Sequence, residues 1–434
     1  MSSRRLSFLV GCVVLLLGIA AVLATATVSD RREAPARATV PQQMPGYSRL
    51  TADLARHPVG AALALYRQGS GLDVAGVPQA LVVGADGAST RRLDQAVRRG
   101  APDVREVPAP VRLSPDGRTA AIGDWNAARS SSDLAFVDLG TGATRVFPVP
   151  PVAGAVPLAW SHDGGRLAYL APDRPPAPSS RSSGPTSGPT SGSTSGPSSD
   201  QVSGQLFVFD TRTDRAAAVP GAADVVAAAF SPDGSRLAVQ GTTAAAVRIV
   251  DPVGGAGRQV PVPAGMRLAG AAAWSPDGEL LALRDGDRHL LFVATTPGRE
   301  VPRPVPGRGD VLGWVAEDAV LHQAPAQGPG HRTDFRVLRT DLADGSATPY
   351  LRIPTGGGSY AVSDLSLATA LLPHAVTVQA TEVDRGPWPL PLRLALVVVG
   401  ALTAVSASAG LRRRWASLQR VLAVPDWARD SARG

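Results

Sequence analysis

The chain has almost no cysteine and no lysine at all. Cys12 is the only cysteine among 434 residues, so no intramolecular disulfide can form and packing or sheet closure must hold any exported domain. Arginine supplies the whole positive charge and Asn126 is the only asparagine, a bias typical of GC-rich coding. Aromatic residues are scarce (5%), whereas glycine (46) and proline (39) are abundant. This balance favours many short strands separated by turns over long helices.

The positive charge lies at the two ends of the chain. Arg4 and Arg5 at the start, with seven arginines and two aspartates from Trp388 onward, account for the whole formal net charge of +7. The stretch from Ser29 to Pro387 is therefore nearly neutral. Because a nucleic-acid-binding domain needs its basic excess on its folded surface, this distribution argues against a nucleic-acid partner.

Two apolar segments predict membrane helices at either end. The first, residues 6–29, follows Arg4 and Arg5 and is long enough to cross a bilayer. The second, residues 388–410, begins at Trp388 and is followed by three consecutive arginines. Arginines mark the cytoplasmic side of a membrane helix, so both termini are predicted to be cytoplasmic and the centre extracytoplasmic. The alternatives are a cleaved signal peptide for the first segment and a buried helix for the second.

These segments divide the chain into predicted parts. Residues 1–5 form a cytoplasmic N-terminus, 30–47 a linker, 48–387 an extracytoplasmic domain, and 411–434 a basic, amphipathic cytoplasmic tail. The expected location is the cytoplasmic membrane, with the bulk of the chain outside the cytoplasm.

A short motif recurs four times within the extracytoplasmic domain. Each copy places Ser, then Pro or His, Asp and Gly after an apolar residue and before an alternating strand, in Ser114-Pro115-Asp116-Gly117, Ser161-His162-Asp163-Gly164, Ser231-Pro232-Asp233-Gly234 and Ser275-Pro276-Asp277-Gly278. The serines are 47, 70 and 44 residues apart, and the long interval contains a Ser/Thr/Pro/Gly-rich stretch, 171–199, which is predicted to be a disordered loop insertion. Short strands repeated at this spacing are typical of β-propeller blades.

The motif has the chemistry of a turn. Proline presets φ, aspartate accepts hydrogen bonds from nearby backbone N–H groups, and glycine tolerates a positive φ. One aspartate per blade is therefore interpreted as structural rather than as part of a metal or carboxylate cluster. The large residue just before each turn is predicted to pack between adjacent blades, at Trp160, Phe230, Trp274 and Trp314.

Weaker copies of the repeat extend the series at both ends. They begin near His57, Gly313 and Ala361, and counting them gives seven units, although six remains open because both end units are degenerate. The predicted fold is all-β: a β-propeller of six to seven four-stranded blades, flanked by N- and C-terminal transmembrane helices.

The four anchored motifs resemble the WD40-like β-propeller repeat (PD40) of TolB-like proteins and of the propellers of prolyl oligopeptidase-family enzymes. The resemblance covers roughly Ser48 to Asp384. In such proteins the repeat forms the structural scaffold, and the function depends on the surface loops. Neither the separate α/β domain of TolB-like proteins nor the hydrolase domain of the peptidases is visible in this sequence. The composition suits a bacterium, and an actinobacterium in particular.

No motif for catalysis or cofactor binding is visible. The sequence has no Gly-x-Ser-x-Gly, His-Glu-x-x-His, paired CxxC, Walker or dinucleotide motif, and its 6 histidines are scattered. No catalytic, cofactor-binding or metal-binding residue is therefore predicted. The expected function is a non-enzymatic scaffold that binds a protein or a cell-envelope ligand outside the membrane. The alternatives are a transmembrane sensor that relays to the cytoplasmic tail and a hydrolase or lyase with its site on the propeller axis.

Overall fold

The computed structural model of the chain describes most of its middle part and little of its ends. The described residues are 35–69, 78–100, 108–125, 132–150, 154–172, 202–243, 245–286, 288–324, 334–355, 362–379 and 382–388, with helical positions at 395–400, 402, 403, 406 and 414. The chain divides into two compact units, one comprising Asp30–Gly386 and the other Met1–Ser29 with Pro387–Gly434.

The predicted membrane segments are described only in part. Residues 6–29 lie outside the described residues, as does most of the insertion predicted at 171–199, and positions 395–400 of the second apolar segment are helical. No helix in the described part of the chain is both long and apolar enough to span a bilayer.

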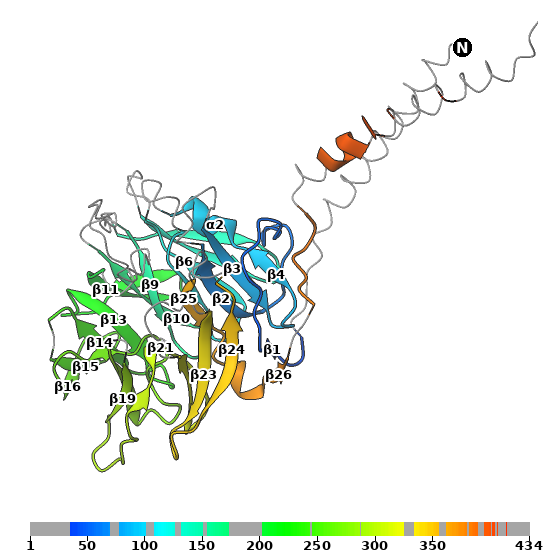
Figure 1. Ribbon diagram of the computed structural model, residues 1–434. Helices are drawn as coiled ribbons and strands as arrows, with labels where there is room; N and C mark the ends of the chain where they lie inside the picture. The colour runs from blue at the N-terminus through cyan, green and yellow to red at the C-terminus, as the bar shows by residue number, and fades with distance from the viewer. Residues whose placement is uncertain are drawn as a thin grey trace, which may run out of the picture. The chain divides into compact units, whose positions relative to one another are not determined.

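The larger unit is built from six four-stranded antiparallel sheets, which are the blades of a propeller (Figure 1). From the innermost strand outward, blades 1 to 3 are β25 (Val362–Leu367), β2 (Ala62–Gln68), β3 (Gln79–Gly84) and β4 (Thr90–Arg92); β5 (Val111–Leu113), β6 (Thr119–Ile122), β7 (Asp133–Asp138) and β8 (Thr144–Pro148); and β9 (Val156–Trp160), β10 (Arg166–Ala171), β11 (Gln205–Asp210) and β12 (Arg215–Ala218). Blades 4 to 6 are β13 (Val225–Phe230), β14 (Leu237–Gly241), β15 (Ala246–Val250) and β16 (Gly257–Pro261); β17 (Arg267–Leu268), β18 (Leu280–Asp285), β19 (His289–Ala294) and β20 (Val305–Pro306); and β21 (Arg308–Ala316), β22 (Ala319–Gln323), β23 (Phe335–Asp341) and β24 (Ala347–Ile353).

The six blades form a closed ring. The innermost strands of blades 1 to 4 contact one another in sequence, β14 contacts β17, β18 contacts β21, and β21 contacts β25. Two short helices accompany the sheets: α2 (Asp94–Arg98) lies between β4 and β5, and the 3-10 helix η3 (Leu372–His374) follows β25 and contacts β21. The all-β propeller expected from the sequence is confirmed, with six blades.

The count of seven repeat units is wrong, and ring closure explains why. β25, from the last apparent unit, pairs with β2, from the first, and the partners include Ala64 with Leu367 and Gln68 with Val362. The two degenerate units are therefore parts of one blade. The strand from the C-terminal end of the domain fills the innermost place in a sheet whose other three strands come from the N-terminal end.

A second contact between the ends of the domain reinforces this closure. β1 (Thr39–Pro41), within the predicted linker, pairs in parallel with β26 (Val376–Val378). Farther along, the backbone N–H of Thr90 on β4 donates to the carbonyl of Asp384 at 2.7 Å. The buried Arg91 side chain also pairs with the Asp384 carboxylate at 2.9 Å. The chain therefore enters and leaves the ring at the outer edge of blade 1.

The strand order gives the ring two distinct faces. In each of blades 2 to 6, the turns between the first and second strands and between the third and fourth strands lie on one face, which we call the turn face. The remaining connections start and end on the opposite face, called the loop face, including those that span residues 126–131, 173–201 and 325–333.

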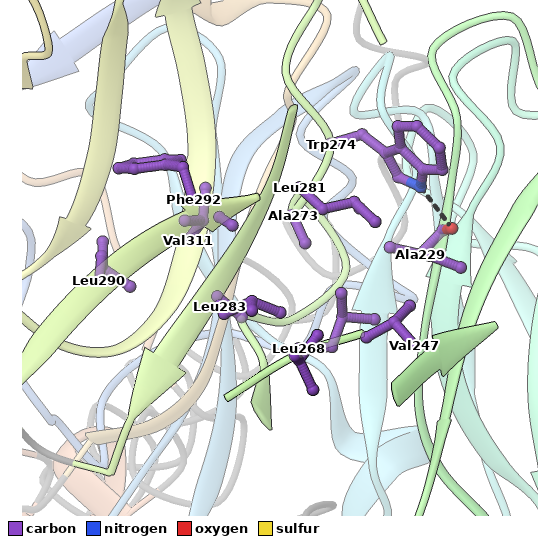
Figure 2. Packing of buried hydrophobic residues seen from close by; sticks show 14 of the residues in the cluster. Ala229, Val247, Leu268, Ala273, Trp274, Leu281, Leu283, Leu290, Phe292 and Val311 are labelled. Atoms are coloured by element: carbon purple, nitrogen blue, oxygen red, sulfur yellow. Dashed lines mark hydrogen bonds between the residues drawn. The ribbon is translucent and has the colours of Figure 1, made fainter. Parts of the chain in front are cut away.

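The hydrophobic core lies between neighbouring blades rather than in one central mass. Alternate residues of each strand face the adjacent sheet, so the period-2 pattern of the sequence fills the space between blades. Figure 2 shows one such region, where Val247 of blade 4 lies near Leu268 and Leu283 of blade 5. The same cluster continues to Val311 of blade 6.

Candidate functional site

The four predicted turn motifs lie on four different blades and share one hydrogen-bond pattern. Each turn serine hydroxyl donates to the turn aspartate at 2.5–2.6 Å, and it accepts the backbone N–H five residues later at 2.9 Å. The N–H of each turn glycine donates to the serine carbonyl at 2.8–2.9 Å. The four serines are buried: Ser114, Ser161, Ser231 and Ser275. The motif thus fastens the first strand of its blade to the second.

The turn carboxylates are acceptors within their own turns. Hydrogen bonds from the Ser161 hydroxyl and the Gly165 N–H lower the pKa of Asp163 to about 2. Hydrogen bonds from Ser231 and Ser235 do the same for Asp233. No group of three or more His, Cys, Asp or Glu side chains in the described part of the chain is placed to hold a metal ion.

The four large residues before the turns lie at the boundaries between blades. The indole N–H of Trp274 donates to the carbonyl of Ala229, on the innermost strand of the preceding blade, at 3.0 Å (Figure 2). Trp314 does the same to Ala272 at 2.9 Å, and Trp160 to Arg112 at 3.4 Å. Phe230 is buried at the equivalent place in blade 4.

All four of these aromatic residues also line a cavity on the propeller axis. The cavity has a volume of about 460 Å³ and takes its lining from all six blades. On the turn face it is lined by His162, Pro232 and Pro276, and toward the loop face by Asp310 and Asp364. The structure therefore brings together the aromatic residues singled out by the sequence, while their neighbouring turn aspartates are not among the lining residues.

An irregular stretch of blades 5 and 6 places an ion pair in this cavity. The innermost strand of blade 5 is interrupted at Gly270, which has a φ of +81°, and a β-carbon there would lie 2.6 Å from the Asp310 carboxyl carbon. Glycine thus makes room for the Asp310 side chain to reach from blade 6. Its carboxylate lies 3.1 Å from Nε of Arg284 on blade 5.

A second ion pair lies within blade 1, beside its joint with blade 2. Asp364 on β25 adopts a φ of +51°, which is strained for a residue with a β-carbon. Its carboxylate pairs with the buried guanidinium of Arg67, which also donates to the carbonyl of Pro108 at 2.8 Å. The same guanidinium lies 5.8 Å from the ring centre of Trp125. These contacts hold the unusual backbone of the closing strand in place.

Comparisons with known proteins bear on the fold alone. No protein-family model and no curated protein matches the sequence. Similar solved structures include TolB from Acinetobacter baumannii, at 14% identity over 72% of this chain and 68% of that one, with a TM-score of 0.45. An oligogalacturonate lyase in complex with manganese is 13% identical over 71% and 78%, with a TM-score of 0.42. An acylaminoacyl peptidase from Pyrococcus horikoshii is 12% identical over 56% and 38%, with a TM-score of 0.35. Similarities this low transfer no function, because β-propellers serve both binding proteins and enzymes.

Sequence reasoning missed the charged residues of the cavity. Arg112 stands two residues before the turn serine Ser114, where the next two blades carry Ala159 and Ala229, so a comparison of the aligned repeats could have found it. Asp310 and Asp364 lie in the irregular repeats of blades 6 and 1, and no local pattern marks them.

Proposed function

We propose that this protein is a non-catalytic binding protein that holds its ligand in the axial cavity of a membrane-anchored, extracytoplasmic propeller. The cavity carries this proposal. Its volume of about 460 Å³ falls in the range of roughly 300–1,000 Å³ typical of small-ligand sites. Its lining joins aromatic and aliphatic side chains to a few charged groups, as such sites commonly do.

The state of the carboxylates favours binding over acid–base catalysis. A general acid or base must be free to exchange its proton with a reacting group. The two carboxylates in the described lining, Asp310 and Asp364, are instead paired with Arg284 and Arg67. Their oxygens are already engaged by guanidinium groups, which suits a role in holding the cavity wall better than proton transfer to a ligand.

The membrane location rests on the arginine-flanked apolar segments of the sequence. The pairing of β1 with β26 is compatible with it, because the chain enters and leaves the propeller at one edge.

Site-specific photocrosslinking in intact cells tests the proposal. A photoreactive side chain at Gln323, which lines the cavity, should give a defined crosslinked product. The matched control is the same side chain at Val253, which is 79% exposed and absent from the cavity lining, and it should not give that product. Identical products from both positions, or none from Gln323, would show that the cavity holds no ligand.

A second experiment addresses the membrane topology. Protease added to intact spheroplasts should digest the propeller while tags at both termini survive on short fragments. A protected propeller would place the domain in the cytoplasm and remove the extracytoplasmic part of the proposal.

A further inference from the structure

The cavity contains an arginine that no carboxylate of the described residues neutralises. Arg112 on β5 is partly buried and lines the cavity. Its Nε donates to the carbonyl of Leu158 on blade 3 at 3.0 Å, and its Nη1 to the carbonyl of Val111 at 3.3 Å. Among the described residues it forms no ion pair, in contrast to Arg284 and Arg67.

The bonds that Arg112 does form fix its position without using up its donors. A guanidinium has five N–H groups, and two of them are occupied by the two carbonyls. About three therefore remain to meet a ligand. The bond to Leu158 also anchors the side chain across the joint between blades 2 and 3. Because the side chain is already ordered, it loses less conformational entropy when a ligand binds.

The other charges at the cavity cancel. Within the described lining, Arg112 and Arg284 balance Asp310 and Asp364. Arg284 is paired with Asp310, and Asp364 is paired with Arg67, which lies outside the lining, so these five groups together carry a single formal positive charge, that of Arg112. One unit of charge matches a monoanion better than a phosphate dianion, which would leave one negative charge uncompensated in a partly enclosed site. The aromatic and aliphatic lining calls for an apolar group beside the anion.

Arg112 is also a departure from the repeat that carries it. Blades 3, 4 and 5 place Ala159, Ala229 and Ala273 two residues before the turn serine, and each of these alanines is fully buried. Blade geometry therefore requires only a small side chain at this position. The charge adds nothing that the turn or the strand pairing needs.

From these observations we propose that Arg112 recognises a carboxylate joined to an apolar group, held in the axial cavity. The inference rests on the proposed function and names the ligand class of the same site. Such a carboxylate belongs to the C-terminus of an apolar peptide or to a small aliphatic acid.

Calorimetric titration of the full-length protein tests this with two acid–amide pairs. The probes are N-acetyl-leucyl-leucine and its C-terminal amide, and hexanoate and hexanamide. The acid of at least one pair should bind more tightly than its amide. Arg112→Ala should lower the affinity for that acid by about tenfold to a hundredfold, the usual effect of removing a charged hydrogen-bond partner. The affinity for the corresponding amide should stay unchanged. Binding of the peptide acid alone assigns a peptide terminus, and binding of hexanoate alone assigns an aliphatic acid.

The matched control is Arg145→Ala, because Arg145 is exposed on the outermost strand of blade 2 and lies outside the cavity lining. It should leave every affinity unchanged. Three results would each overturn carboxylate recognition. The acid and its amide could bind equally well, Arg112→Ala could bind the acid as tightly as the wild type, or the wild type could fail to bind either acid at millimolar concentration. The crosslink from Gln323 decides separately whether the cavity holds any ligand, so failure of carboxylate recognition can be distinguished from failure of the proposed function.

Discussion

Replacing Gly117 with alanine should destabilise the propeller more than the same change at Gly164, although both occupy the same place in equivalent turns. Their φ angles are +70° and +66°. A β-carbon at Gly117 would lie 2.1 Å from the carbonyl oxygen of Ala62 on blade 1, whereas one at Gly164 would meet no atom within 4 Å. The two substitutions therefore share the backbone strain and differ in the steric clash.

The structure sets the size of each effect. The left-handed conformation costs an alanine about 1–2 kcal/mol, and this should be the whole effect at Gly164. Overpacking adds about 1–3 kcal/mol at Gly117, because the clash is with backbone that cannot rotate away. Ala62 N also donates to the Gly117 carbonyl at 2.7 Å, so relieving the clash strains the contact between blades 1 and 2. Gly117→Ala should lose about 2–5 kcal/mol in all.

Urea unfolding followed by tryptophan fluorescence and circular dichroism provides the assay. The difference between the variants' free energies of unfolding cancels the strain they share and isolates the clash. Equal losses from both substitutions would refute the reasoning, because the contact between blades would then contribute nothing. A larger loss at Gly164 would show that the turn strain itself was misjudged.

Three further perturbations test other contacts. Ser231→Ala removes a buried hydroxyl that both donates and accepts, so the free energy of unfolding should fall by about 1–3 kcal/mol in urea titration, and an unchanged value would contradict the turn's role. Arg91→Leu removes the bonds to Asp384 and should cost about 1–3 kcal/mol, with faster proteolysis of the C-terminal segment; an unaltered cleavage rate would count against this closure. Burial lowers the pKa of His322 below its ordinary 6.5, so the neutral ring stabilises the fold fully above that pH and less as the pH falls toward the folded-state value. The urea midpoint should therefore drop from pH 7.5 to 5.5 in the wild type and change less in His322→Gln; parallel pH profiles would exclude this residue as the cause.

The blade turns could be predicted from the sequence because their chemistry is local. Ser231, Asp233 and Gly234 lie within four residues, and their hydrogen bonds form within the turn and with the strand that follows it. The alternating strand after each turn likewise identified the sheets. Four copies at regular spacing were enough to predict an all-β propeller.

The number of blades could not be predicted because it depends on a contact between distant parts of the chain. β2 and β25 are separated by almost the full length of the domain, and each belongs to a degenerate repeat. Counted along the chain they are two units, and paired in space they belong to one blade. Only the closed ring distinguishes these descriptions.

The sequence by itself determined the repeat, the turns and the large residues that precede them, since each depends on neighbours a few positions away. The tertiary structure alone decided which of those residues share a cavity and which charges remain there. Arg284 of blade 5 meets Asp310 of blade 6, and Arg67 meets Asp364 between the two strands that close blade 1. Among the described residues, the Arg112 side chain donates to carbonyl groups and to no carboxylate. The strength of a charge–charge interaction depends on distance in space, and ring closure sets those distances for residues that the chain keeps far apart.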